Sequence, residues 1–232
     1  MATLPLLEQA IAAHGGRERF NALQQVRVRV EHLGGMIPWL TGLGKSYPQP
    51  AEFQVDFRSG RVSFLRYPNE HSVTVYQRGG VSCDGREIPD YRRRFDGWSK
   101  RRRWDPSDAA YFFGYAFWDY LTIPYSLENA SITEASNDCI VRVQPEGTDS
   151  HSAVQRFYFD RSGRLARHDY RADVIGRIFT GAHLSTDYAE HTPILFAQTR
   201  RVYARVRALR TPVSVLDARL RVVSWECSEY EH

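Results

Sequence analysis

The sequence is poor in cysteine, with only Cys83, Cys139 and Cys227 among 232 residues. They are odd in number and far apart, and no CxxC pair occurs, which argues for a reducing compartment and against both a disulfide framework and a zinc site. Residues 1–9 lack the charged and long apolar regions of a signal peptide, and no lipoprotein-type cysteine lies near the start. We therefore expect a cytoplasmic protein.

Motifs for metals and nucleotides are lacking as well. The sequence contains no HxxxH, HExxH or acidic calcium loop, and it contains no glycine-rich phosphate loop of the GxGxxG or P-loop type. Its glycine pairs at 15–16, 34–35 and 79–80 are typical of turns. We therefore expect no metal and no cofactor.

A long apolar run is a third absence. The uncharged run 109–118 is much shorter than the roughly 20 residues that a membrane span needs, and Asp119 follows it directly. The composition, with 42% apolar and 25% charged residues, is that of a globular protein. A chain of this length fits one β-rich domain, so we expect a single domain over residues 1–232 without a membrane span.

The net charge of +4 is concentrated in one segment. Residues 92–103 carry seven Lys or Arg residues against Asp96, a net +6, so the rest of the chain carries −2. Nucleic-acid-binding domains usually spread basic residues over a face, so we do not expect nucleic acid as the partner. Three interpretations stay open for this segment: a solvated loop, a surface whose Phe95 and Trp98 stack on bases, or a site that recruits an anionic head group to a pocket.

The most aromatic stretch is residues 104–125, with nine aromatic residues among 22 and no Lys or Arg. Asp105 suits the N-cap of a helix, the proline after it suits the first position, and Asp108 suits the N3 position near the positive end of the helix dipole. Pro124 disfavours helical geometry at the residue before it. The stretch therefore predicts one helix over 106–122.

The faces of this helix are apolar nearly all round, which indicates a buried helix. Its stripes at helical spacing are Tyr111, Tyr115 and Trp118; Phe113, Phe117 and Tyr120; and Phe112, Tyr115 and Asp119. Ligand pockets are mostly apolar with a few placed polar groups. Two interpretations therefore stay open: the helix is a solid core plug, or part of its surface lines a ligand cavity.

Most of the remaining chain alternates between apolar and polar residues, as strands with one buried face do. Short turns join about 10 or 11 such strands. Apolar residues at helical spacing over 6–11 predict an N-terminal helix that ends at the glycine pair 15–16, and a short second helix follows. The glycine- and proline-rich residues 34–50 predict a loop or lid that carries Trp39.

An antiparallel meander of this length curls around a core. The predicted fold class is therefore α+β, mainly β: a strongly curved antiparallel sheet, forming a half or open β-barrel. An N-terminal helix accompanies the sheet, and the aromatic helix lies against its concave face.

Several motifs then suggest a family. They are AxHGG before a Phe, a Leu and a VxVxV strand; YFxGYAxWxYLTxP at 111–124; FYFDxxGxLxRxDY at 157–170; and TRRVY at 199–203. With these motifs the chain resembles the lipoprotein-sorting-factor-like (LolA/LppX-like) open β-barrel superfamily, and within it a group of uncharacterised bacterial proteins. The resemblance implies a barrel that binds acyl chains on its apolar concave face. Because the signal peptide and lipobox are lacking here, it implies a cytosolic container for an apolar molecule.

Candidate chemistry is sparse. His168 and Tyr170 share a strand face and could supply an acid/base and a hydrogen-bond donor, although a structural histidine is the simpler interpretation. His183, Ser185 and Asp187 also share a face, but their ends lie roughly 13 Å apart along a strand, so we interpret that strand as a surface strand rather than as a nucleophilic triad.

A charged pair is also expected inside the sheet. One of the adjacent Arg200 and Arg201 must point inward or lie near a strand end, and an inward arginine needs a carboxylate or an anionic ligand. Asp119 would lose hydration among the aromatic rings, which raises its pKa unless a cation pairs with it. We expect that cation to be Arg200, Arg201 or His168.

The leading functional hypothesis is a carrier or sensor that binds a hydrophobic or aromatic small molecule in the concave cavity. The alternative is a cofactor-free biosynthetic enzyme of secondary metabolism, such as a cyclase, isomerase or lyase, acting on an apolar metabolite there. The candidate catalytic residues are Asp119, His168 and Tyr170. The candidate ligand-binding residues are Trp39, Trp104, Tyr111, Phe112, Tyr115, Trp118, His183 and Arg200.

Overall fold

A computed structural model describes residues 4–42, 49–88, 91–95, 103–144, 150–175, 180–189, 192–206, 209–211 and 213–227. Its helices are α1 (Pro5–Ala13), α2 (Arg17–Ala22), α3 (Ile37–Leu40) and α4 (Pro106–Thr122), with short 3-10 helices η1 (Tyr91–Phe95) and η3 (Tyr125–Leu127). The strands are β1 (Leu23–Gly34), β2 (Glu52–Asp56), β3 (Arg61–Leu65), β4 (Val73–Gln77), β5 (Gly80–Cys83), β6 (Arg86–Ile88), β7 (Ile132–Ser136), β8 (Cys139–Val143), β9 (Val154–Phe159), β10 (Leu165–Tyr170), β11 (Thr180–Tyr188), β12 (Ala197–Val206), β13 (Leu209–Arg210) and β14 (Leu216–Cys227).

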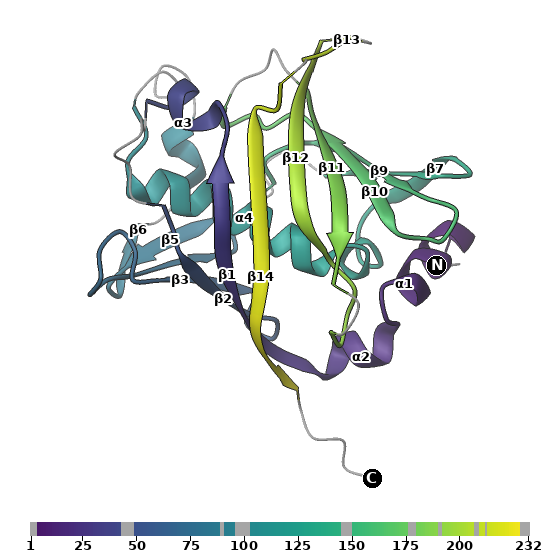
Figure 1. Ribbon diagram of the computed structural model, residues 1–232, viewed down its shortest axis with the longest axis horizontal. Coiled ribbons are helices and arrows are strands. Elements are labelled where there is room, and N and C mark those ends of the chain that lie inside the picture. Colours follow the sequence, from purple (N-terminus) through teal and green to yellow (C-terminus); the bar gives the residue numbers. More distant parts are fainter. Residues whose placement is uncertain are drawn as a thin grey trace.

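The strands form one antiparallel sheet that curves around α4 (Figure 1). The order is β6-β5-β4-β3-β2-β1-β14-β12-β11-β10-β9-β8-β7, and β13 pairs with β12. The long strands β1 and β14 come from the two ends of the chain and pair at the centre. Since β6 and β7 stand at opposite ends of the order, the described sheet is open. The predicted open, curved antiparallel sheet with its inner helix is therefore confirmed.

The prediction of 10 or 11 strands was too low, because the described residues contain fourteen. One reason is the stretch 81–88, which contributes to two strands rather than one. Asp84 and Gly85 have positive φ angles of 50° and 79° and divide it into β5 and β6. An Asp-Gly pair between two short strands is a strong hairpin signal, so the sequence itself contained the information.

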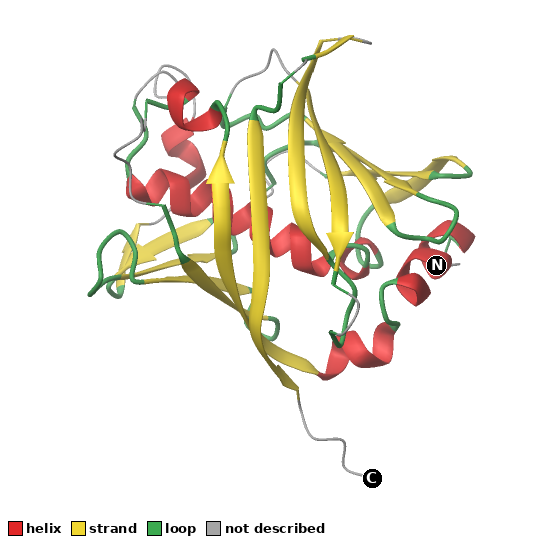
Figure 2. Ribbon diagram, in the orientation of Figure 1, coloured by secondary structure: helices red, strands yellow, loops and turns green. Residues whose placement is uncertain are grey.

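The N-terminal helix agrees with its sequence pattern. In α1 the buried residues are Leu6, Leu7, Ala10 and Ile11. They belong to a small core beside β8, β9 and β10, with Ile140, Phe157 and Leu165 among its members. Figure 2 shows α1 and α2 together at one end of the sheet, while α4 crosses its interior. The expected loop or lid at 34–50 instead contains the short helix α3, and residues 43–48 lie outside the described part of the chain.

Helix α4 begins and ends where the sequence predicts. The Asp105 side chain accepts a hydrogen bond from the Asp108 backbone, and the Asp108 side chain accepts one from the Asp105 backbone, which forms a capping box. Most of the helix is buried, and its aromatic side chains belong to the main core with Phe53, Val55 and Phe64 from β2 and β3.

Gly114 allows α4 to approach β4 closely. A Cβ atom at Gly114 would lie 2.3 Å from Cβ of Tyr76, which real structures do not tolerate. We expect Gly114→Ala to lower the free energy of unfolding by roughly 1–3 kcal/mol, because overpacking a core outweighs the better helix propensity of alanine. Urea unfolding measures this, and a single transition there would support the single-domain prediction.

The matched control is Gly80→Ala, where the nearest atom to the new Cβ is 3.3 Å away. A stability of Gly114→Ala equal to that of the control would contradict the close approach.

Candidate functional site

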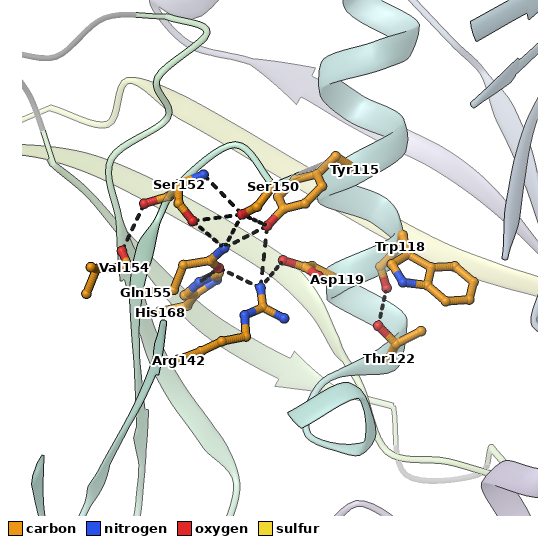
Figure 3. A network of polar contacts seen from close by, with 10 residues as sticks. All are labelled: Tyr115, Trp118, Asp119, Thr122, Arg142, Ser150, Ser152, Val154, Gln155 and His168. Atoms are coloured by element: carbon orange, nitrogen blue, oxygen red, sulfur yellow. Dashed lines mark hydrogen bonds and ion pairs between the residues drawn. The ribbon is translucent and has the colours of Figure 1, made fainter. Parts of the chain in front are cut away.

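Helix α4 presents two different sides to the sheet. Toward β2 and β3, the ring of Phe117 stacks on that of Phe53 at 4.3 Å between centroids and lies 6.1 Å from that of Phe64. This side is a solid apolar core. On the other side, Tyr115 and Asp119 lie one turn apart on the same face and meet polar side chains from β8, β9 and β10 (Figure 3).

The central contact on this polar side is a buried ion pair. A guanidinium nitrogen (Nη2) of Arg142, on β8, donates to Oδ2 of Asp119 at 3.2 Å, and about 5% of each side chain is exposed. Burial raises the pKa of Asp119, and the positive charge of Arg142 opposes that shift. Arg142 therefore replaces the expected partners Arg200, Arg201 and His168, and that prediction was wrong.

Gln155 on β9 connects the pair to the rest of the network. Its Oε1 atom accepts a hydrogen bond from Arg142 at 2.8 Å and lies 2.8 Å from Nε2 of His168. An arginine can only donate hydrogen bonds, so the amide oxygen of Gln155, and not its nitrogen, faces Arg142 and His168. An amide oxygen can only accept, so His168 must carry a proton on Nε2. The Gln155 amide nitrogen donates to the Tyr115 hydroxyl at 2.7 Å and to Ser150 Oγ at 3.1 Å. The network therefore holds the helix and three strands in one arrangement.

A partly open cavity of about 460 Å³ adjoins the ion pair. Its walls come from α4, from the turns that end the β2–β3 and β4–β5 hairpins, and from β8. The lining residues are Phe57, Arg58, Gly60, Tyr76, Arg78, Tyr115, Trp118, Asp119, Ser126, Arg142, Gln144 and Ser150. The cavity thus combines aromatic walls with three arginines and one carboxylate, and it is more polar than the sequence led us to expect.

The arginines at the two turns differ from Arg142. Arg58 and Arg78 are exposed, and neither has an ion-pair partner within the part of the chain that the structure describes. The Asp119 carboxylate is already engaged by Arg142. The cavity therefore carries uncompensated positive charge at its mouth.

A second buried polar cluster lies along β10, β11 and β12. His183 stacks on Tyr170 at 4.6 Å, and its Nδ1 atom lies 3.4 Å from the Tyr120 hydroxyl. Arg200, which is 2% exposed, donates to Ser185 Oγ at 2.7 Å and lies over the Tyr120 ring. Burial lowers the pKa of His183 to about 3.

This cluster corrects the expectation of a surface strand. His183 and Ser185 point into the protein and are buried, whereas Asp187 is exposed. The three residues do not come together, so no catalytic triad exists among them. Of the adjacent arginines, Arg200 is the inward one and Arg201 is exposed, as the alternation requires.

The predicted site residues fall into four places. Tyr115, Trp118 and Asp119 line the cavity. The buried polar clusters contain His168, Tyr170, His183 and Arg200. His168 is connected to Asp119 through Gln155 and Arg142. His183 and Arg200 contact α4 at Tyr120. Trp104, Tyr111 and Phe112 lie in the solid core, and Trp39 is 72% exposed on α3.

Sequence reasoning missed the residues that complete the site, above all Arg58, Arg78, Arg142 and Gln155. A signal for Arg142 was present, because it lies two positions after Ile140 and so shares its inward face. The apolar residues Cys139, Val141 and Val143 alternate on the opposite face and obscure this signal. No comparable signal marked the arginines at the two turns.

Comparisons with known proteins give a fold-level likeness. No protein-family model matches the sequence, and no curated protein is similar to it. A crystal structure of a DUF1329 family protein from Desulfovibrio piger aligns with 98% of this chain and 93% of its own, at 9% identity and a TM-score of 0.42. A putative outer membrane lipoprotein-sorting protein domain from Vibrio parahaemolyticus aligns with 97% and 94%, at 7% identity and a TM-score of 0.40.

Similarity this low carries no argument about family or function. Membership of the lipoprotein-sorting-factor-like superfamily, the acyl-chain cargo and the cytoplasmic location therefore remain predictions. Among the described residues, no helix has the length and apolar character needed to cross a membrane.

Proposed function

We propose that the protein is a carrier or sensor for a small amphipathic anion, such as an organic carboxylate with an aromatic or aliphatic body. The observation that supports this is the cavity beside Asp119 and Arg142, whose aromatic wall ends at two arginines without ion-pair partners among the described residues. The proposal keeps the hydrophobic or aromatic ligand predicted from the sequence and adds an anionic group to it.

The ligand's two parts follow from the two kinds of wall. Phe57, Tyr76 and Trp118 line the cavity with aromatic side chains that suit an apolar body. The guanidinium groups of Arg58 and Arg78 suit a carboxylate, because their planar donor forks match its geometry. Arg142 already donates hydrogen bonds to Asp119 and Gln155, so we assign it a structural role in the site and not a role in ligand binding.

A cofactor-free enzyme is the second candidate, and one observation favours it. Burial raises the pKa of Asp119 at the cavity wall, so this carboxyl holds a proton more tightly than an exposed one does. It could exchange a proton with a bound substrate, with Tyr115 beside it, in a cyclase, isomerase or lyase reaction. His168 would act through Gln155, and Tyr170 would shape the buried surroundings.

Paired dyes test the binding proposal. The anionic probe 1-anilinonaphthalene-8-sulfonate and the neutral probe N-phenyl-1-naphthylamine share an aromatic body, and titration of each gives its Kd by fluorescence. Arg58→Gln with Arg78→Gln should weaken the anionic probe about tenfold or more, since each charged hydrogen bond is worth roughly 1.5–3 kcal/mol. The neutral probe should bind almost unchanged.

The control variant carries Arg86→Gln and Arg221→Gln, which remove the same charge at exposed positions outside the cavity. Equal loss of the anionic probe in both double variants would reduce the effect to net charge and refute the assigned role of the cavity mouth. Failure of the wild-type protein to bind either probe would favour the solid-core interpretation.

A further inference from the structure

A small cavity lies on the outer face of the sheet. Its volume is about 170 Å³, and its walls come from β1, β14 and β12, which are neighbours in the sheet and pass in front of α4 in Figure 1. Its polar residues alternate with the buried Arg200, Ala218 and Leu220, so they face away from the interior. The lining residues are His32, Thr199, Arg201, Asp217, Ala218 and Arg219. The cavity is smaller than the roughly 300–1,000 Å³ of pockets for drug-sized ligands, and it suits a small ion.

The strand register groups four of these side chains into a square. Arg219 on β14 pairs with Thr199 on β12, and two residues away Asp217 pairs with Arg201. Neighbouring positions on one face of a sheet are roughly 5 Å apart across strands and 7 Å apart along them. The two arginines therefore stand at opposite corners of the square, on either side of a space that one small anion fills. His32 on β1 pairs with Arg219 and adds a ring nitrogen to the cavity.

The two arginines lack the ion pairs that other arginines of this face have. Neither Arg201 nor Arg219 makes an ion pair or a side-chain hydrogen bond with another residue in the described part of the chain. Asp217 pairs with Arg201 in the register, but its Oδ2 atom accepts a hydrogen bond from Ser214 Oγ at 2.6 Å instead. The arginines with carboxylate partners are Arg27 and Arg29 at Glu52, Arg205 at Asp169, and Arg221 at Glu31. Two cations without such partners in one small cavity indicate an anion site.

Two buried oxygens at this cavity also lack partners. Thr199 is 6% exposed, and its Oγ1 atom has no hydrogen-bond partner among the described residues; the same holds for Oδ1 of Asp217. Buried polar atoms are nearly always hydrogen-bonded, and an exception calls for an explanation such as a bound water or ion. A threonine hydroxyl donates or accepts, whereas a carboxylate oxygen only accepts. A ligand that satisfies the whole set must therefore accept hydrogen bonds from the arginines and donate one to Asp217.

We propose that this cavity is a binding site for inorganic phosphate. Hydrogen phosphate presents oxygens to Arg201 and Arg219, whose planar donor forks match them, and its P–OH group donates to Asp217. Sulfate is a dianion too, but it has no hydroxyl, so its oxygens would meet the carboxylate with like charge. A zwitterion such as glycine has an ammonium group for Asp217, but without net charge it leaves the excess cation unbalanced. The inference does not depend on the ligand proposed for the cavity beside Asp119.

Titration calorimetry at pH 8 tests the site with three dianions of matched charge: inorganic phosphate, sulfate and methyl phosphate. Only inorganic phosphate keeps a P–OH group there, because a phosphate monoester loses its last proton near pH 6. We expect one phosphate per chain, bound about tenfold or more tighter than the other two dianions. Asp217→Asn should lower this preference about fivefold or more, because an asparagine amide donates as well as accepts.

The arginines are tested by Arg201→Gln with Arg219→Gln, which should weaken phosphate binding about tenfold or more. The control variant carries Arg29→Gln and Arg221→Gln, which remove the same charge from the same face outside the cavity and should bind phosphate nearly as the wild type does. Circular dichroism checks that each variant stays folded.

Four results would overturn the proposal. They are absence of phosphate binding by the wild type, equal or tighter binding of sulfate, methyl phosphate or glycine, equal loss in both double variants, and a phosphate preference that Asp217→Asn leaves unchanged.

Discussion

Replacing Arg142 by methionine should lower the free energy of unfolding by about 3–5 kcal/mol, because the change leaves the buried Asp119 without its cation. Arg142 and Asp119 are each about 5% exposed and lie 3.2 Å apart. The loss extends beyond the pair, since Arg142 also donates to Gln155 Oε1. Urea unfolding of the variant and the wild type measures the difference.

The double variant Asp119→Leu with Arg142→Met should recover most of this loss, because two apolar groups leave no buried charge without a partner. The matched control is Arg17→Met at the surface, where Arg17 pairs with Glu8 and Glu128 and all three side chains are at least 30% exposed. That change should cost about 1 kcal/mol or less. An Arg142→Met protein as stable as the Arg17 variant would show that the buried pair contributes nothing.

Asp119→Asn separates a structural role from a functional one. The structure favours a loss of stability of a few kcal/mol, because Arg142 then faces a neutral group inside the protein. An unchanged melting temperature together with lost probe binding would instead show that the carboxylate serves function and does not stabilise the protein. A variant that is both stable and fully competent would contradict the burial of this side of α4.

Acid should unfold the protein steeply, beginning near pH 6.5. Burial lowers the pKa of four histidines: His14 to about 4, His183 to about 3, and His151 and His168 well below 6.5. Between pH 6.5 and those lower values the unfolded chain binds more protons than the folded one, so stability falls as the pH falls. Each histidine contributes about 1.4 kcal/mol per pH unit.

Asp119 acts in the opposite direction. Its raised pKa means that the folded protein takes up this proton at a higher pH than the unfolded chain does. The four imidazoles together contribute roughly 5 kcal/mol per pH unit where all of them respond, and Asp119 reduces this slope. Urea unfolding at steps between pH 7 and pH 5 measures the slope.

His151 allows the slope to be assigned to one residue. It is fully buried, its ring stacks on that of Tyr115 at 4.1 Å, and neither ring nitrogen has a hydrogen-bond partner in the described residues. His151→Phe keeps the ring and should reduce the slope by about 1.4 kcal/mol per pH unit. The exposed His71, changed to Gln, should leave it unchanged. A stability that is flat between pH 7 and pH 5 would contradict the burial of these histidines.

Local chemistry in the sequence was enough to place α4 and to assign strand faces. The Asp105 cap, the proline after it and Pro124 act over a few residues, so the ends of the helix follow from the sequence alone. Alternation likewise shows that only one of Arg200 and Arg201 can point inward. The strand count was too low at Asp84 and Gly85, where an Asp-Gly turn separates β5 from β6.

Only the tertiary structure decided what Asp119 meets. Alternation gives the face of each residue, but it does not show which strand crosses which turn of the helix. Arg142 and Arg200 are both buried inward arginines, yet the sheet order places β8 beside Asp119, whereas Arg200 reaches α4 at the Tyr120 carbonyl. The cavity, too, depends on two hairpin turns and β8 meeting at α4, an arrangement of distant segments that no local pattern encodes.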